Sequence, residues 1–318
     1  MSKRIDAELS FLLDEAEADR RFLMTSDPNL QRCLVRRVRT GELASPLPRV
    51  FSRPDYLREL THEQRQLHSM RALGGHHPTW VFVRGSAALA QGLFVGRALT
   101  GTICVASAYT ATAGGVQHER LRVMGRCEAS GVWVTSVLQT MVDCLRNTPF
   151  EQGLGIADSA LANLGLNREY VAELVREGWG GARGIRHALQ TLAWANPLSE
   201  SGGESYVRAR IVQLGFAEPI LQVELPDPLN PGSAYRVDLF WRLAGGITIA
   251  GEVDGLEKYR LPDSSGVINE TKKFVAERQR ESRLTLGVDR IFRITPAQAR
   301  SDAYLTRLLE QYGVPRVR

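Results

Sequence analysis

Three acidic residues in the last third of the chain have the spacing of a divalent-metal site. Asp238 lies within Val237–Trp241, and Glu252 and Asp254 lie two residues apart within Ile247–Gly255. Both runs alternate and are rich in β-branched and aromatic residues, so they predict the two strands of a hairpin. Residues two apart on a strand share a face at a spacing of about 7 Å, which brings the three carboxylates together. Such a cluster is costly without a cation or hydrogen bonds, and its hard oxygen atoms suit Mg²⁺ or Mn²⁺.

The elements around the hairpin must position these carboxylates. The alternation along the first strand places four residues on the face opposite Asp238: Tyr235, Val237, Leu239 and Trp241. A fourth carboxylate, Glu204, is expected in the first turn of a helix that Ser199 or Ser201 caps and Gly215 ends. The alternative interpretation of the acidic residues is a solvated hairpin edge.

The remaining elements of this region follow a definite order. Ile220–Val223 predicts a strand before the hairpin, and Val288–Ile294 predicts another after it. Between them, a helix from about Ile268 to Leu286 carries basic residues suited to grip a phosphate backbone: Lys272, Lys273 and Arg280. A final helix closes the chain, so the order is helix, three strands, helix, strand, helix.

This order resembles the core of the PD-(D/E)xK, or restriction-endonuclease-like, nuclease superfamily. Residues 199–318, somewhat over a third of the chain, look like its very-short-patch-repair type. Carried over by that resemblance, Glu204, Asp238, Glu252 and Asp254 match the metal and acid positions, and Mg²⁺ or Mn²⁺ is the implied cofactor. The family's lysine two residues after the glutamate is missing, because Asp254 stands there. Lys258 is the expected substitute, and catalytic competence depends on whether it reaches the site.

The N-terminal part carries a basic helix after a strong helix-start signal, Thr25–Pro28. Leu30, Cys33, Leu34 and Val38 form its apolar face. The opposite face carries four arginines: Arg32, Arg36, Arg37 and Arg39. A hairpin-like segment that ends at Arg53 follows. Helix, turn, basic helix and basic hairpin are typical of a winged helix-turn-helix, in which the basic helix enters the major groove and the wing contacts phosphates. The alternative is a solvated helix surface.

A second resemblance spans about residues 10–195. Val35–Leu43 with Arg49–Phe51 is similar to the winged-helix start of AbiEi-like antitoxins of type IV toxin–antitoxin systems. Arg84–Leu89, Thr140–Asp143 and Ala157–Leu161 resemble later segments of the same family, in the same order. The resemblance implies DNA binding, in some relatives as repression of their own operon, and a cognate toxin as a candidate partner.

The middle of the chain offers little chemistry of its own. Val81–Val83, Thr102–Val105 and Leu121–Val123 predict short strands. Asp143 and Asp158 are expected to cap or brace helices rather than bind a metal ion.

Length and composition limit the possible classes of protein. The chain has 318 residues and a net charge of +5, which allows two or three domains. We expect an α/β (α+β) protein with a winged helix-turn-helix at 1–65, an AbiEi-like α/β domain at 66–196 and the nuclease-like αβββαβ core at 197–318. The four cysteines show no C-x-x-C spacing, which argues against a zinc finger and indicates a reducing cytoplasm. Neither a signal peptide nor an apolar run of about 20 residues is present, which predicts no membrane contact.

The leading hypothesis is a cytoplasmic DNA-binding protein with a metal-dependent endonuclease domain, in phage defence or a toxin–antitoxin system. The alternative is a non-catalytic AbiEi-like antitoxin or transcriptional regulator whose nuclease fold is a relic. A third interpretation is a module that binds a partner protein through its middle domain. Sequence alone leaves open the target, DNA versus RNA and the oligomeric state.

Overall fold

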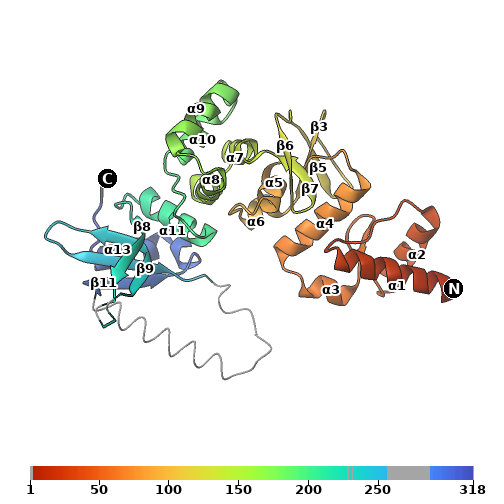
Figure 1. The fold of residues 1–318 in the computed structure, drawn as a ribbon, viewed down its shortest axis with the longest axis horizontal. Coiled ribbons are helices and arrows are strands. Elements are labelled where there is room, and N and C mark those ends of the chain that lie inside the picture. The colour runs from red at the N-terminus through yellow and green to blue at the C-terminus, as the bar shows by residue number, and fades with distance from the viewer. Residues whose placement is uncertain (1–2, 228, 231, 256–286, 318) are drawn as a thin grey trace. The chain divides into compact units, whose positions relative to one another are not determined.

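The structure is a computed structural model that describes residues 3–227, 229–230, 232–255 and 287–317. Helices and strands are mixed, as the α/β class predicts (Figure 1). The chain folds into two compact units. Unit 1 contains Met1–Thr148 and Glu173–Leu189, and unit 2 contains Pro149–Ala172 and Gln190–Arg318. The expected domain boundaries at 65/66 and 196/197 stay predictions.

Unit 1 begins with two helices and a hairpin: α1 (Lys3–Ala18), α2 (Pro28–Arg39), β1 (Ala44–Leu47) and β2 (Val50–Ser52). The predicted start of α2 is confirmed, because the Asp27 carboxylate accepts the N–H of Asn29 at 2.7 Å and Pro28 occupies the first turn. One apolar cluster joins both helices to the hairpin and contains the buried Leu9, Leu34 and Phe51. The predicted apolar face of α2 therefore faces this core.

The rest of unit 1 is an α/β region around two small sheets. Its helices are α3 (Pro54–Glu59), α4 (His62–His76), α5 (Arg84–Ala90), α6 (Arg97–Thr100) and α7 (Val137–Leu145). Its strands are β3 (Ile103–Ser107), β4 (Ala111–Ala113), β5 (Val116–Arg120), β6 (Arg126–Ala129) and β7 (Val132–Thr135). One sheet has the order β3-β5-β4, and β6 pairs with β7. The helices α9 (Arg168–Trp179) and α10 (Ile185–Leu192) each cross a boundary between the two units.

Leu121–Val123 is not a strand, so that prediction was wrong. β5 ends at Arg120, β6 begins at Arg126, and the residues between them have no regular structure. The side chain of Gln139 on α7 holds this segment instead. Its carbonyl oxygen accepts the N–H of Met124 at 2.9 Å, and its amide donates to the carbonyl of Arg122 at 2.8 Å. These bonds satisfy backbone groups that a strand partner would otherwise satisfy.

Unit 2 contains a four-stranded sheet in the order β11-β10-β9-β8, in which only β10 and β11 are parallel. Its strands are β8 (Ile220–Pro226), β9 (Ala234–Arg242), β10 (Thr248–Val253) and β11 (Arg290–Ile294). Its helices are α8 (Phe150–Leu164), α11 (Gly202–Gln213), the short 3₁₀ helix η2 (Gln298–Arg300) and α13 (Asp302–Tyr312). Side chains of α11 and α13 pack in one core with Leu239, Trp241 and Phe292 of the sheet. The helix expected from Ile268 to Leu286 lies outside the described residues.

Two further findings concern the helices and the cysteines. Among the described residues, no helix is long and apolar enough to cross a membrane. The cysteines form no disulfide, and Cys104 and Cys144 are buried. Burial raises the pKa of the Cys104 thiol to about 11 and that of Cys144 to about 12. Both thiols therefore stay protonated near neutral pH and pack as small apolar groups.

Candidate active site

In β8 of the unit 2 sheet, the regular alternation of side chains between the two faces is broken at Gln222. This residue has φ of 53° although it lies within β8, between the cross-strand pairs Leu221–Leu239 and Val223–Val237. Leu221 packs in the core with α11 and α13, whereas Val223 packs in the apolar cluster of the other face. A left-handed residue in a strand rotates the chain and reverses the alternation beyond it.

The same reversal appears on β9 and corrects one expectation. Leu239 and Trp241 pack with α11 and α13, but Val237 and Tyr235 pack in the cluster of the opposite face. The prediction that these four side chains share one face was therefore wrong. Strict alternation assumes an unbroken pleat, and the pleat of β9 is broken between Val237 and Leu239.

Glu204 lies in the first turn of α11, where the sequence placed it. Ser201 caps the helix by accepting the N–H of Glu204 at 3.1 Å, and the Ser201 hydroxyl donates back to Oε1 of Glu204 at 2.8 Å. Oε2 accepts the N–H of Glu200 at 2.9 Å and Nε2 of Gln222 at 3.0 Å. Burial raises the pKa of Glu204, and the negative charge of Asp238 acts in the same direction.

Asp238 lies beside Glu204 and is held by two strands. Nε2 of Gln222 donates to Oδ1 of Asp238 at 3.5 Å, so one amide group bridges the carboxylates of Glu204 and Asp238. The N–H of Val253 donates to Oδ2 at 2.8 Å. Because Gly251 pairs with Leu239, continuing the register places Glu252 opposite Asp238. Glu252 is buried, with 7% of its surface exposed.

Asp254 follows β10 directly and is partly exposed, and its N–H donates to the carbonyl of Ile294 at 3.0 Å. Asp238 and Glu252 are thus carboxylates on adjacent strands, with Glu204 linked to Asp238 through Gln222. This oxygen donor set is of the kind that Mg²⁺ prefers. However, no three acidic, histidine or cysteine side chains in the described ranges lie close enough together to hold a metal ion. The expected basic residues Lys258, Lys272, Lys273 and Arg280 lie outside the described residues.

The arginines predicted to contact DNA fall into two groups. Arg32, Arg36 and Arg39 are exposed on α2. Arg37 forms an ion pair with Asp6 of α1. Arg53 donates to Oδ1 of Asp14 at 2.7 Å and to Oε2 of Glu17 at 2.8 Å, both on α1. Arg37 and Arg53 therefore connect α2 and the hairpin to α1.

Sequence reasoning missed two residues of this region, Gln222 beside the carboxylates and Arg208 on the helix that carries Glu204. Nothing in the strand pattern around Gln222 indicated a left-handed conformation. Arg208 also escaped notice, although it lies four residues after Glu204 and three before the buried Ile211, which places all three on one face of α11. That spacing was the available signal for a buried arginine.

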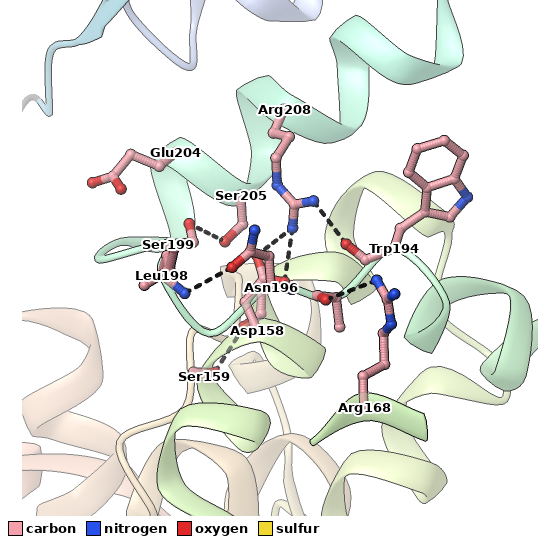
Figure 2. Close-up of polar contacts among 12 residues, drawn as sticks. Asp158, Ser159, Arg168, Trp194, Asn196, Leu198, Ser199, Glu204, Ser205 and Arg208 are labelled. Carbon is pink, nitrogen blue, oxygen red and sulfur yellow. Dashed lines mark hydrogen bonds and ion pairs between the residues drawn. The ribbon is translucent and has the colours of Figure 1, made fainter. Parts of the chain in front are cut away.

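Arg208 connects α11 to α8 through a buried ion pair (Figure 2). Its Nη2 donates to both carboxylate oxygens of Asp158 at 2.8 and 2.9 Å, and both side chains are fully buried. Nη1 donates to the carbonyl of Trp194 at 2.7 Å and to Glu218 at 2.9 Å. The N–H of Asn196 also donates to Asp158, at 2.8 Å. The expectation that Asp158 braces helices is confirmed.

Comparisons with known proteins give limited similarity. The chain is 28% identical over 156 residues to uncharacterised proteins of Mycobacterium tuberculosis strains CDC 1551 and H37Rv, a match that covers 48% of this chain. The chain spans about half the length, 53%, of these curated relatives. No family model matches the chain, and no solved structure matches it.

Proposed function

We propose that this protein binds nucleic acid and cleaves phosphodiester bonds with Mg²⁺ or Mn²⁺ at the carboxylates of unit 2. The observation that carries the proposal is the bridge that Gln222 makes between Glu204 and Asp238. The half-buried side-chain amide of Gln222 joins two carboxylates, and the backbone of this residue is left-handed. Backbone strain of this kind concentrates at functional sites. The resemblance to the PD-(D/E)xK nucleases gives these residues the same roles.

Some residues of the site would hold a cation, and others fix the orientation of the side chains that hold it. Asp238 and Glu252 would hold the ion, with Glu204 completing the shell directly or through water. When bound, the ion supplies an acidic water molecule and stabilises negative charge on the phosphate. Gln222 and the N–H of Val253 fix the orientation of Asp238. Asp254 or Lys258 would position the attacking water or remove its proton.

The exposed arginines of α2 would bind the nucleic acid that the site cleaves. In a winged helix-turn-helix, Arg32, Arg36 and Arg39 would face the major groove and its phosphates. Each phosphate contact releases counterions, so the logarithm of the affinity falls by about 0.9 per contact for each tenfold rise in salt. Alanine at one of these positions should lower that slope by about one unit or less.

Plasmid cleavage tests the assignment of the site. Purified protein is incubated with supercoiled plasmid and Mn²⁺ or Mg²⁺, next to Asp238→Ala and Glu252→Ala. Glu224→Ala is the matched control, because Glu224 is an exposed carboxylate on β8. We expect nicking by the parent chain and the control but not by the two site variants. Cleavage that persists in both site variants would show that the activity resides elsewhere.

A non-catalytic regulator of the AbiEi type is the second candidate. Two observations favour it: both Glu204 oxygens accept hydrogen bonds that cap or flank α11, and the described residues contain no three-ligand metal group. This function predicts sequence-selective binding to the protein's own operator without cleavage under any divalent ion. Mobility-shift assays with the upstream DNA, and recovery of a cognate toxin by the tagged full chain, test it.

A further inference from the structure

A cavity of about 610 Å³ in unit 1 lies between α5, the irregular segment after β5, α7 and the end of α9. Four arginines line it: Arg84, Arg120, Arg122 and Arg146. Asp143 contributes the one acidic side chain of the lining, and Trp179 contributes an aromatic ring. Ligand sites have volumes of about 300–1,000 Å³, so the cavity is large enough for a small molecule.

The charges of the lining are unbalanced. Arg84 pairs with Glu119 at 3.3 Å, and Nη1 of Arg146 lies 3.7 Å from Oδ1 of Asp143. Arg120 and Arg122 make no ion pair with any described residue, and both are exposed. Positive charge concentrated in a concave site attracts anions, and guanidinium groups suit phosphate oxygens.

Hydrogen bonds fix the wall of the cavity. Gln139, 2% exposed, fixes the segment that carries Arg122 and Met124 through its two amide hydrogen bonds. Nε of Arg146 donates to the carbonyl of Arg183 at 2.6 Å, which anchors that guanidinium. Arg84 has φ of 52° although it is the first residue of α5. Fixed donors and a strained backbone are features of binding sites.

Two buried polar atoms of the lining residues have no hydrogen-bond partner among the described residues. They are Oδ2 of Asp143, whose residue is 5% exposed, and Nε of Arg84. A buried polar atom without a partner costs about 1–3 kcal/mol. A ligand that carries both an anion and a hydrogen-bond donor would satisfy both atoms, whereas inorganic phosphate at neutral pH serves mainly the arginines.

We propose that this cavity binds a nucleoside phosphate. The phosphates lie against Arg120 and Arg122, and a sugar hydroxyl or base N–H donates to Oδ2 of Asp143. The base lies against Trp179, since stacking on an aromatic ring contributes about 1–3 kcal/mol per base. This site is in unit 1 and is independent of the carboxylates of unit 2, so either proposal can fail alone.

Calorimetric titration of the full chain tests the proposal with ATP, GTP, pyrophosphate, inorganic phosphate and a short DNA duplex. We expect a nucleoside triphosphate to bind at micromolar concentration and pyrophosphate at least tenfold more weakly. Arg122→Ala should weaken nucleotide binding about tenfold or more, as expected for loss of a charge-assisted bond. Arg97→Ala, which removes an equal charge from an exposed position outside the cavity, should leave the affinity unchanged.

A second variant separates the nucleoside contact from the phosphate contact. Asp143→Asn should weaken ATP or GTP but should not weaken pyrophosphate, because only the nucleoside donates to Oδ2 and the loss of a negative charge favours the phosphates. Circular dichroism of each variant confirms folding. Binding of the duplex alone, of phosphate alone at millimolar concentration, or of nothing would overturn the proposal. Equal nucleotide affinity in the parent chain and Arg122→Ala would overturn it as well.

Discussion

Removal of Asp158 should destabilise unit 2 more than any exposed substitution. Asp158→Ala leaves the guanidinium of Arg208 fully buried, with the Trp194 carbonyl and Glu218 as its remaining partners among the described residues. Breaking a buried ion pair on one side costs about 3–5 kcal/mol, because the remaining charge stays desolvated. The substitution also removes the acceptor for the N–H of Asn196. We therefore expect a loss in the free energy of unfolding at the upper end of that range.

Glu218→Ala is the matched control, since it removes the other carboxylate that contacts Arg208. The Glu218 side chain is 42% exposed, so solvent screens this pair and its loss should cost less than about 1 kcal/mol. Urea unfolding followed by far-ultraviolet circular dichroism measures both changes. The double variant Asp158→Leu/Arg208→Met should be less destabilised than the sum of its single variants, because no charge stays buried. Equal costs for Asp158→Ala and Glu218→Ala would refute the argument.

Three further predictions concern unit 1. Burial is the main cause that raises the pKa of Asp143, so the folded state binds a proton more tightly than the unfolded state does. The stability of the parent chain should therefore fall as pH rises from about 4, the unfolded pKa of aspartate, through the raised value. Asp143→Asn lacks this dependence, so its melting temperature should exceed that of the parent chain by more at pH 7.5 than at pH 5. The same difference in melting temperature at both pH values would contradict the raised pKa of Asp143. Cys104 and Cys144 should resist a thiol reagent at pH 8 until the protein is unfolded, because burial raises their pKa values to about 11 and about 12; rapid labelling of the folded chain at either position would show that the thiol is accessible. Gly85→Ala should destabilise unit 1 by about 1–3 kcal/mol in thermal or urea unfolding, because the new Cβ would lie 2.0 Å from the carbonyl oxygen of Leu99; an unchanged midpoint would mean that α5 and α6 separate easily.

Local signals made much of the fold predictable. The start of α2 followed from Asp27 and Pro28, whose capping and fixed φ act within one turn. The predicted strands around Asp238 and Glu252 are present as β9 and β10, and Glu204 lies in the first turn of α11 as expected. These features depend on residues close in sequence, where periodicity and caps carry most of the information.

The parts that escaped prediction depend on contacts between distant segments. The exchange of faces at Gln222 depends on one backbone angle that no side-chain pattern encodes. The irregular segment at Leu121–Val123 has strand-like composition, but Gln139 from another element satisfies its backbone. Arg208 could be buried only because Asp158, 50 residues away in sequence, meets it. Contacts with residues distant in sequence thus determine the local structure where amino-acid composition alone does not.

Both candidate sites contain a residue with a strained backbone. Five described residues other than glycine have positive φ: Arg20, Arg49, Arg84, Ser130 and Gln222. Three of them lie in turns, where a left-handed residue reverses the chain and needs no further explanation. Arg84 begins a helix and Gln222 lies inside a strand, where such an angle costs about 1–3 kcal/mol and forms no turn. The first lines the arginine-rich cavity and the second bridges two carboxylates, so each strained residue directs a polar side chain to a candidate site. Glycine at either position should relieve the strain and raise stability, but it should weaken the function of that site because the polar side chain is removed. If the left-handed residue served only the path of the backbone, glycine would raise stability without any loss of function.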